Sequence, residues 1–96
     1  MRAIAETAIV LAMNSKHRKT LEVIFADPIN GNLDWSRIEA LLVSIGCRVV
    51  EGSGSSVGFE KNGVRVRFHR PHPGKAALKY RVKDARAFLQ QIGITP

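Results

Sequence analysis

Alternating polar and apolar side chains on either side of Asn62-Gly63 predict a β-hairpin over residues 56–69. Asn-Gly favours a two-residue type I′ turn, because both central residues of that turn need a positive φ. The turn sets the cross-strand pairs: Lys61 with Val64, Glu60 with Arg65, Phe59 with Val66, Val57 with Phe68, and Ser56 with His69. One face of the hairpin is then apolar, and the other carries Ser56, Glu60, Arg65, Arg67 and His69.

A first amphipathic helix is expected over about residues 16–25, upstream of the hairpin. Its apolar stripe consists of Leu21, Ile24 and Phe25. Asn14 or Ser15 can cap its start, because a short polar side chain accepts a hydrogen bond from the first turn. Asp27-Pro28 ends the helix, since proline cannot continue it. His17 falls on the charged face of this helix, and we expect it to be solvated.

A second helix is expected after Asp34, which is a suitable cap. Its apolar positions follow the helical period and are Ile38, Leu41, Leu42 and Ile45. Trp35 lies in the first turn and should pack on the core, and Gly46 should end the helix in the left-handed conformation. The run from Cys47 to Val50 then predicts a short strand that leads through a flexible turn into the hairpin.

The segment after the hairpin, residues 69–75, reads HRPHPGK and is predicted to be a loop, because its two prolines prevent the sheet from continuing. Residues 76–81 are expected to form either another short strand or an irregular link. A last helix is predicted over about residues 82–92. The pattern indicates an α+β fold, a three-stranded antiparallel sheet with helices packed on one face and the other face open to a ligand.

The composition agrees with one small globular domain of 96 residues, of which 45% are hydrophobic. We expect residues 1–13 to be an N-terminal extension and residues 14–96 to be the domain. The apolar run at residues 1–12 contains Glu6 and is too short to span a bilayer, so no membrane association is expected. Met13 is an alternative start of the domain. The lone Cys47 is expected in the core and favours a reducing, cytoplasmic compartment.

The net charge of +7 arises in one segment. Residues 1–46 and 47–63 are each balanced, whereas residues 64–86 carry eight Lys or Arg against one Asp, which accounts for the whole excess. A basic field of this kind favours a polyanion, bound with a steep salt dependence. The alternative is a solvated basic surface.

Residues 33–94 resemble the HicA family of bacterial toxins in the order of several short motifs. The motifs are the helix from Trp35 to Leu42 ending in Ile45-Gly46, the Gly54-Ser55 turn into Val57-Gly58-Phe59, the loop from His72 to Lys75, and the terminal segment from Phe88 to Ile94. The resemblance implies a fold similar to a double-stranded-RNA-binding domain and an endoribonuclease that cleaves mRNA and arrests translation. It also implies neutralisation by an acidic HicB-type antitoxin.

The chain departs from the family pattern at one position. The family places a catalytic histidine after Gly-Ser, whereas this chain has Ser56 there. A hydroxyl is a poor base, and cleavage by the ribose 2′-hydroxyl needs a proton acceptor, a proton donor and a cation. An imidazole suits the first two tasks. The hairpin register puts His69 opposite Ser56, so we expect His69 to supply the imidazole from the neighbouring strand.

His72 is then expected to act as a second acid or a phosphate contact, with Arg65 or Arg67 stabilising charge. Further RNA contacts are expected from Arg70, Lys75 and Lys79. Alternatively, the two histidines are exposed residues that contact RNA or water. No metal or other cofactor is expected, because the chain has no carboxylate cluster and cations surround its histidines.

Three functions therefore remain open: a metal-independent endoribonuclease toxin, an RNA-binding relative that has lost catalysis, and a module that only binds the antitoxin.

Overall fold

The computed structural model describes residues 8–96 as helices and one three-stranded antiparallel sheet with the strand order β1-β2-β3. Its elements are α2 (Ser15–Ile24), α3 (Trp35–Ser44), β1 (Arg48–Glu51), β2 (Ser56–Lys61), β3 (Val64–His69) and α4 (Leu78–Gln91). Residues 8–12 are also helical. The predicted α+β class is confirmed. From α3 to α4 the order is helix, three strands, helix, which is the topology expected of a double-stranded-RNA-binding domain.

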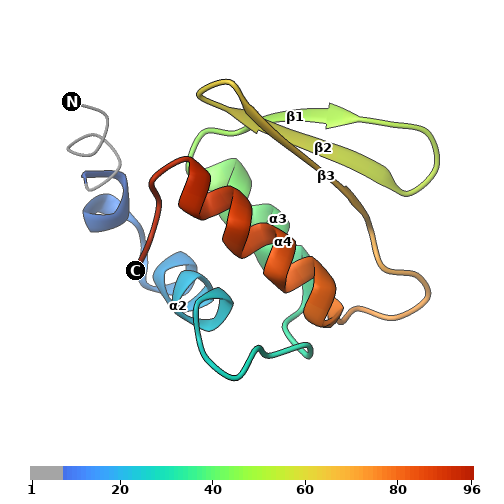
Figure 1. Cartoon of the computed structure of the whole chain (residues 1–96), viewed down its shortest axis with the longest axis horizontal. Coiled ribbons are helices and arrows are strands. Elements are labelled where there is room, and N and C mark those ends of the chain that lie inside the picture. The colour runs from blue at the N-terminus through green and yellow to red at the C-terminus, as the bar shows by residue number, and fades with distance from the viewer. Residues whose placement is uncertain (1–7) are drawn as a thin grey trace.

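The elements lie in layers, as Figure 1 shows. The sheet forms one side of the molecule, α3 and α4 run beneath it, and α2 lies beyond these two helices. The sheet face turned away from the helices carries exposed side chains, Arg65, Arg67 and His69 on β3. One face of the sheet is therefore core and the other is accessible.

The hairpin has the register that the sequence predicts. Ser56 pairs with His69, Glu60 with Arg65, and Lys61 with Val64. Asn62 and Gly63 form the turn with φ values of 54° and 79°, both in the left-handed region that a type I′ turn requires. The pairing therefore follows from the turn and from the alternation of the flanking residues.

Aromatic packing fixes the inner face of the hairpin to α3. Phe68 lies between Trp35, with ring centroids 4.9 Å apart, and Phe59, with centroids 6.0 Å apart. The prediction that Trp35 packs on the core is thus confirmed. Asn14 and Asp34 are the helix caps, and their side chains accept hydrogen bonds from the backbone N–H groups of His17 and Ser36.

The expectation for residues 76–81 was wrong, because α4 already begins at Leu78. Ala76 forms a single bridge with Asp34 and no strand follows. The sequence pattern concealed the first turn because the buried stripe of α4 starts with an arginine, Arg81. In addition, Ala77 at the N-cap makes no side-chain hydrogen bond, so no capping residue marks the start.

The N-terminal segment contributes to packing where it is described. Ile9, Val10 and Met13 are partly buried against the core cluster. The first seven residues of the expected extension lie outside the described residues. The boundary between an extension over residues 1–13 and a domain over residues 14–96 stays a prediction.

Candidate functional site

The open end of the hairpin brings Ser56, Arg67 and His69 together on the outer face of the sheet. Ser56 is opposite His69 in the register. The Nη1 atom of Arg67 donates a hydrogen bond of 2.7 Å to Oγ of Ser56. Ser56 is 9% exposed, whereas His69 is exposed. The hydroxyl and the guanidinium are therefore in contact, and the imidazole belongs to the residue opposite the hydroxyl on the adjacent strand.

Two glycines leave room for this arrangement. A Cβ atom at Gly52 would lie 2.8 Å from Oγ of Ser56 and 2.9 Å from Nη1 of Arg67. A Cβ atom at Gly58 would lie 3.5 Å from Nη2 of Arg67. Any side chain at Gly52 would displace the hydrogen-bonded pair, so the glycine lets the turn before β2 pass close to the guanidinium.

The other end of the same face, near the turn, carries a carboxylate that binds two cations. Glu60 accepts hydrogen bonds from Nη2 of Arg48 at 2.6 Å and from Nε of Arg65 at 2.7 Å. The bond from Arg65, followed by that from Arg48, holds the pKa of Glu60 below its ordinary value. Arg65 is therefore tied to an acid next to the turn.

Arg70 joins the end of the hairpin to two other elements. Its guanidinium forms ion pairs with Glu39 of α3, at 2.8 Å, and with Glu51 of β1, at 3.0 Å. The hydrogen bonds from Arg70 are the main reason that the pKa of each carboxyl lies below its ordinary value. Glu39 also accepts a hydrogen bond from Nε1 of Trp35 at 2.8 Å. This network anchors the chain directly after His69.

Arg81 holds the backbone of His69 itself. Its Nε atom donates a hydrogen bond of 2.6 Å to the carbonyl of His69, and Nη1 donates one of 3.1 Å to the carbonyl of Ala77. In the sequence, Arg81 is expected only as part of the basic field. No local signal distinguishes it from exposed arginines, apart from its spacing before Val82 and Ala85 in the apolar stripe of α4.

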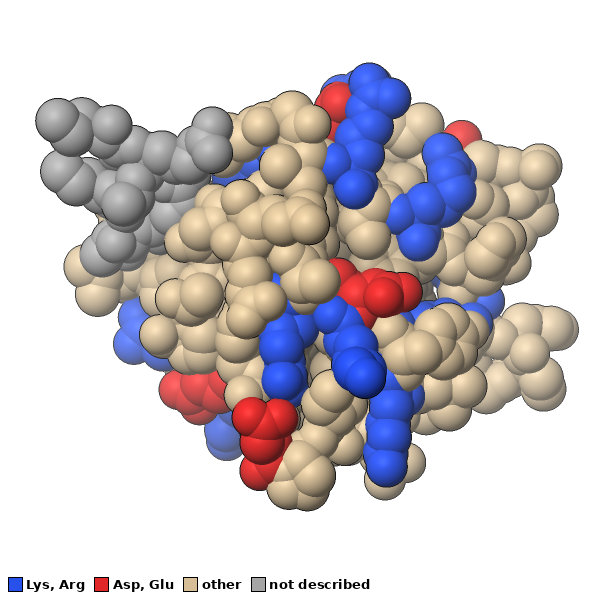
Figure 2. Space-filling model, in the orientation of Figure 1, with Lys and Arg blue, Asp and Glu red and all other residues tan. Residues whose placement is uncertain are grey.

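The basic segment divides into cations with internal partners and cations on the surface. Arg86 donates to the carbonyls of Ile24 and Ala26 and pairs with Asp27, so it ties α4 to the end of α2. Lys75 and Lys79 are exposed. Figure 2 shows Lys and Arg side chains in separate groups with acidic side chains between them on the face in view. Some cations of the basic segment therefore stabilise the fold, and others are accessible on the surface.

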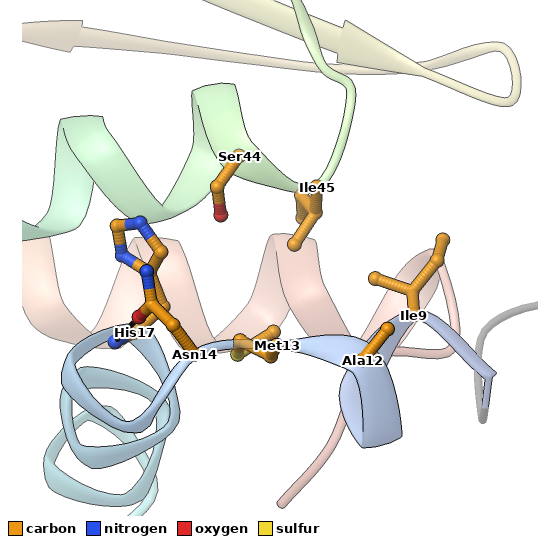
Figure 3. A pocket seen from close by; sticks show the side chains of 7 residues that line it. All are labelled: Ile9, Ala12, Met13, Asn14, His17, Ser44 and Ile45. Carbon is orange, nitrogen blue, oxygen red and sulfur yellow. Dashed lines mark hydrogen bonds between the residues drawn. The ribbon is translucent and has the colours of Figure 1, made fainter.

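His17 and Cys47 lie outside the hairpin. His17 is partly buried, so it is less exposed than expected. Figure 3 shows it with Asn14 and Ser44 at a largely apolar pocket of about 410 Å³, which the N-terminal segment and the end of α3 also line. Cys47 is buried, and burial raises the pKa of its thiol to about 11, which agrees with the expected core role.

Residues 8–96 contain no group of three or more His, Cys, Asp and Glu side chains placed to hold a metal ion. None of the helices in these residues is long and apolar enough to cross a membrane.

The sequence model of a protein family, the HicA toxin of bacterial toxin-antitoxin systems, matches residues 35–94. These residues make up more than half of the chain and extend from the start of α3 past the end of α4. The class of protein is therefore the toxin of a bacterial toxin-antitoxin system, and the chain belongs to the HicA toxin family. The resemblance seen in the sequence is confirmed. Comparisons with curated proteins and with solved structures found no match.

Proposed function

We propose that this HicA-family toxin is a metal-independent endoribonuclease that cleaves mRNA, arrests translation and is neutralised by an acidic HicB-type antitoxin. The observation that carries the proposal is the pairing of His69 with Ser56, the position of the family histidine. The hydrogen bond between Arg67 and Ser56 adds a cation at the same place. An imidazole can accept or donate a proton, and a guanidinium can offset the charge that develops on the phosphorane, which are tasks of phosphodiester cleavage.

In the proposed reaction, His69 accepts the proton of a ribose 2′-hydroxyl. The 2′-oxygen forms a bond to phosphorus while the bond from phosphorus to the 5′-oxygen breaks. His72 donates a proton to the departing 5′-oxygen. The products are a 2′,3′-cyclic phosphate and a 5′-hydroxyl, so atoms and charge balance without a metal ion or an added water.

Arg67 is the better of the two candidates for stabilising the phosphorane. Arg65 forms an ion pair with Glu60, which offsets part of its charge. Arg67 instead donates to a neutral hydroxyl, and its charge is not cancelled by that partner. In this proposal Ser56 has no role as a base. It orients the guanidinium that faces the reacting phosphate.

RNA binding is proposed for Arg67, Lys75 and Lys79, which are exposed. The RNA contacts expected from Arg65 and Arg70 stay predictions, and both guanidinium groups are held by carboxylates. An acidic antitoxin would complement the same exposed cations and could compete with RNA for them.

RNA binding without cleavage is the second candidate function. It is favoured by Ser56, because a hydroxyl that accepts a hydrogen bond from Arg67 cannot replace a catalytic imidazole. In that case His69 and His72 only contact RNA or solvent. The retained surface cations would be sufficient for salt-dependent binding.

Induced expression in bacteria distinguishes the two functions. The endoribonuclease should stop growth and fragment mRNA, and RNA ends should carry a 2′,3′-cyclic phosphate. Co-expression of the protein encoded next to the toxin gene should restore growth. RNA binding in vitro that weakens with salt, with intact RNA in the induced cells, would refute cleavage and support the second candidate.

A further inference from the structure

A cavity of about 270 Å³ lies where the loop after β3 meets the start of α4. Its lining residues are Pro71, His72, Gly74, Ala76, Leu78 and Arg81. None of these belongs to the two hairpin strands, so the cavity lies beyond the end of the hairpin, and it shares His72 with the proposed reaction. One water occupies about 30 Å³ of liquid, so the cavity has room for a phosphate group and several waters.

Arg81 is a buried cation in the wall of this cavity. It is 8% exposed, and its two hydrogen bonds go to the neutral carbonyls of His69 and Ala77. Its guanidinium also lies 4.6 Å from the centroid of the Tyr80 ring. Within residues 8–96 it forms no ion pair, and residues 71–83 contain no Asp or Glu. A guanidinium has five N–H donors and keeps its charge when buried, so an anion would complete its environment.

The rim of the cavity is held in shape by the loop before α3. The backbone N–H of Leu78 donates to the carbonyl of Gly31 at 3.0 Å, and that of Ala77 donates to the carbonyl of Leu33 at 2.8 Å. Leu78 has a φ of 69°, which is strained for a residue with a side chain, and it is 50% exposed. Strain of this kind persists only where surrounding contacts enforce it, so the rim is preorganised.

We propose that this cavity binds a phosphate group of the RNA backbone, next to the phosphate that is cleaved. Arg81 donates to the phosphate oxygens from the wall, as guanidinium groups do in charge-assisted pairs. His72 lines the same cavity, and Lys75 and Lys79 flank it in the sequence. Because Arg81 also holds the carbonyl of His69, a phosphate bound here aligns the RNA with that residue. That the bound phosphate belongs to RNA rests on the proposed function, whereas the binding of a phosphate group by the cavity does not.

The first test uses inorganic phosphate and nuclear magnetic resonance on the full chain. We expect saturable shifts of the Arg81 Nε–H signal and of the amides of residues 72–78. Leu78→Glu, which puts a carboxylate on the exposed rim, should abolish them. Leu78→Gln has nearly the same shape without the charge and should keep them. Absent shifts, or equal shifts in Leu78→Glu and Leu78→Gln, would overturn the proposal.

The second test uses an RNA that cannot be cleaved because its 2′-hydroxyls are methylated. Loss of one phosphate contact should lower the slope of log affinity against log salt by about 0.7 for a single strand in Leu78→Glu. Gln90→Glu adds the same charge to an exposed position near the other end of α4, about 18 Å along the helix, and should leave the slope unchanged.

The two tests separate this proposal from the proposed function. Saturable phosphate binding with no change in the RNA slope would overturn the RNA backbone as the ligand. If Leu78→Glu lowers the salt slope but the unsubstituted protein cleaves no RNA, the result would support phosphate binding in the cavity and refute the endoribonuclease.

Discussion

The two ends of the polar hairpin face contain similar residues but differ in how their cations are partnered. Near the turn, Glu60 pairs with Arg48 and Arg65. At the open end, Arg67 donates to the neutral hydroxyl of Ser56, and His69 lies opposite that serine. The difference lies in the partner of each guanidinium. Arg67 has a neutral partner at one end, whereas Glu60 holds two cations at the other end and offsets one of their two charges.

This contrast shows that net charge does not measure the charge available to a ligand. The chain carries +7, and its excess lies within residues 64–86. In the same segment, Arg70 and Arg86 form ion pairs, and Arg81 is buried. The position of each carboxylate and carbonyl decides which cations can meet RNA.

The largest effect is expected from His69→Ala at the open end. Losing the proposed proton acceptor should lower the rate of RNA cleavage by about 10²–10⁴-fold. Glu60→Gln, at the turn end of the same face, is the control and should not lower the rate, because it removes no proposed reacting group and frees two cations. Cleavage of a labelled RNA by the purified variants measures both. A large loss in Glu60→Gln, or none in His69→Ala, would break the contrast.

The two arginines provide a smaller test of the same contrast. Arg67→Gln removes the proposed cation at the phosphorane and should lower the single-turnover rate on the order of 10²-fold. Arg65→Gln removes a cation that is already paired with Glu60 and should have little effect on this rate. Equal losses in the two variants would show that both guanidinium groups act only through general charge.

The smallest effect concerns stability in acid at the turn end. The pKa of Glu60 is lowered in the folded chain, so the stabilisation by its ionised form is complete above the unfolded pKa, about 4.3, and is lost as the pH falls through the folded value. Urea unfolding should find Glu60→Gln less stable than the unsubstituted chain at pH 7. The difference should shrink steadily below about pH 4.3. A difference that stays constant with pH would refute this role of Glu60.

Much of the hairpin could be predicted from the sequence because its determinants are local. The Asn62-Gly63 turn sets the register, and the alternation sorts the two faces, so the pairing of Ser56 with His69 followed directly. The helix caps at Asn14 and Asp34 are equally local signals. The family motifs then supplied the position where a histidine is replaced.

The partners of the arginines could not be predicted in the same way. Arg70 meets Glu39 across 31 residues, a contact that exists only after the sheet has packed on α3. Arg81 was missed because a buried arginine looks like a surface residue in a hydropathy pattern, and the start of α4 was misplaced for the same reason. Long-range contacts of charged groups therefore limit what the sequence shows about this site.

The central claim is that the catalytic imidazole has moved from the position of Ser56 to His69 on the neighbouring strand. The most direct measurement is RNA cleavage by His69→Ala and by the double variant Ser56→His/His69→Ala. Opposed side chains lie only about 4.5–5.5 Å apart at Cβ, so an imidazole at either position can serve one site. We predict that His69→Ala is inactive and that the double variant regains cleavage. An active His69→Ala variant, or a folded double variant that stays inactive, would contradict the claim.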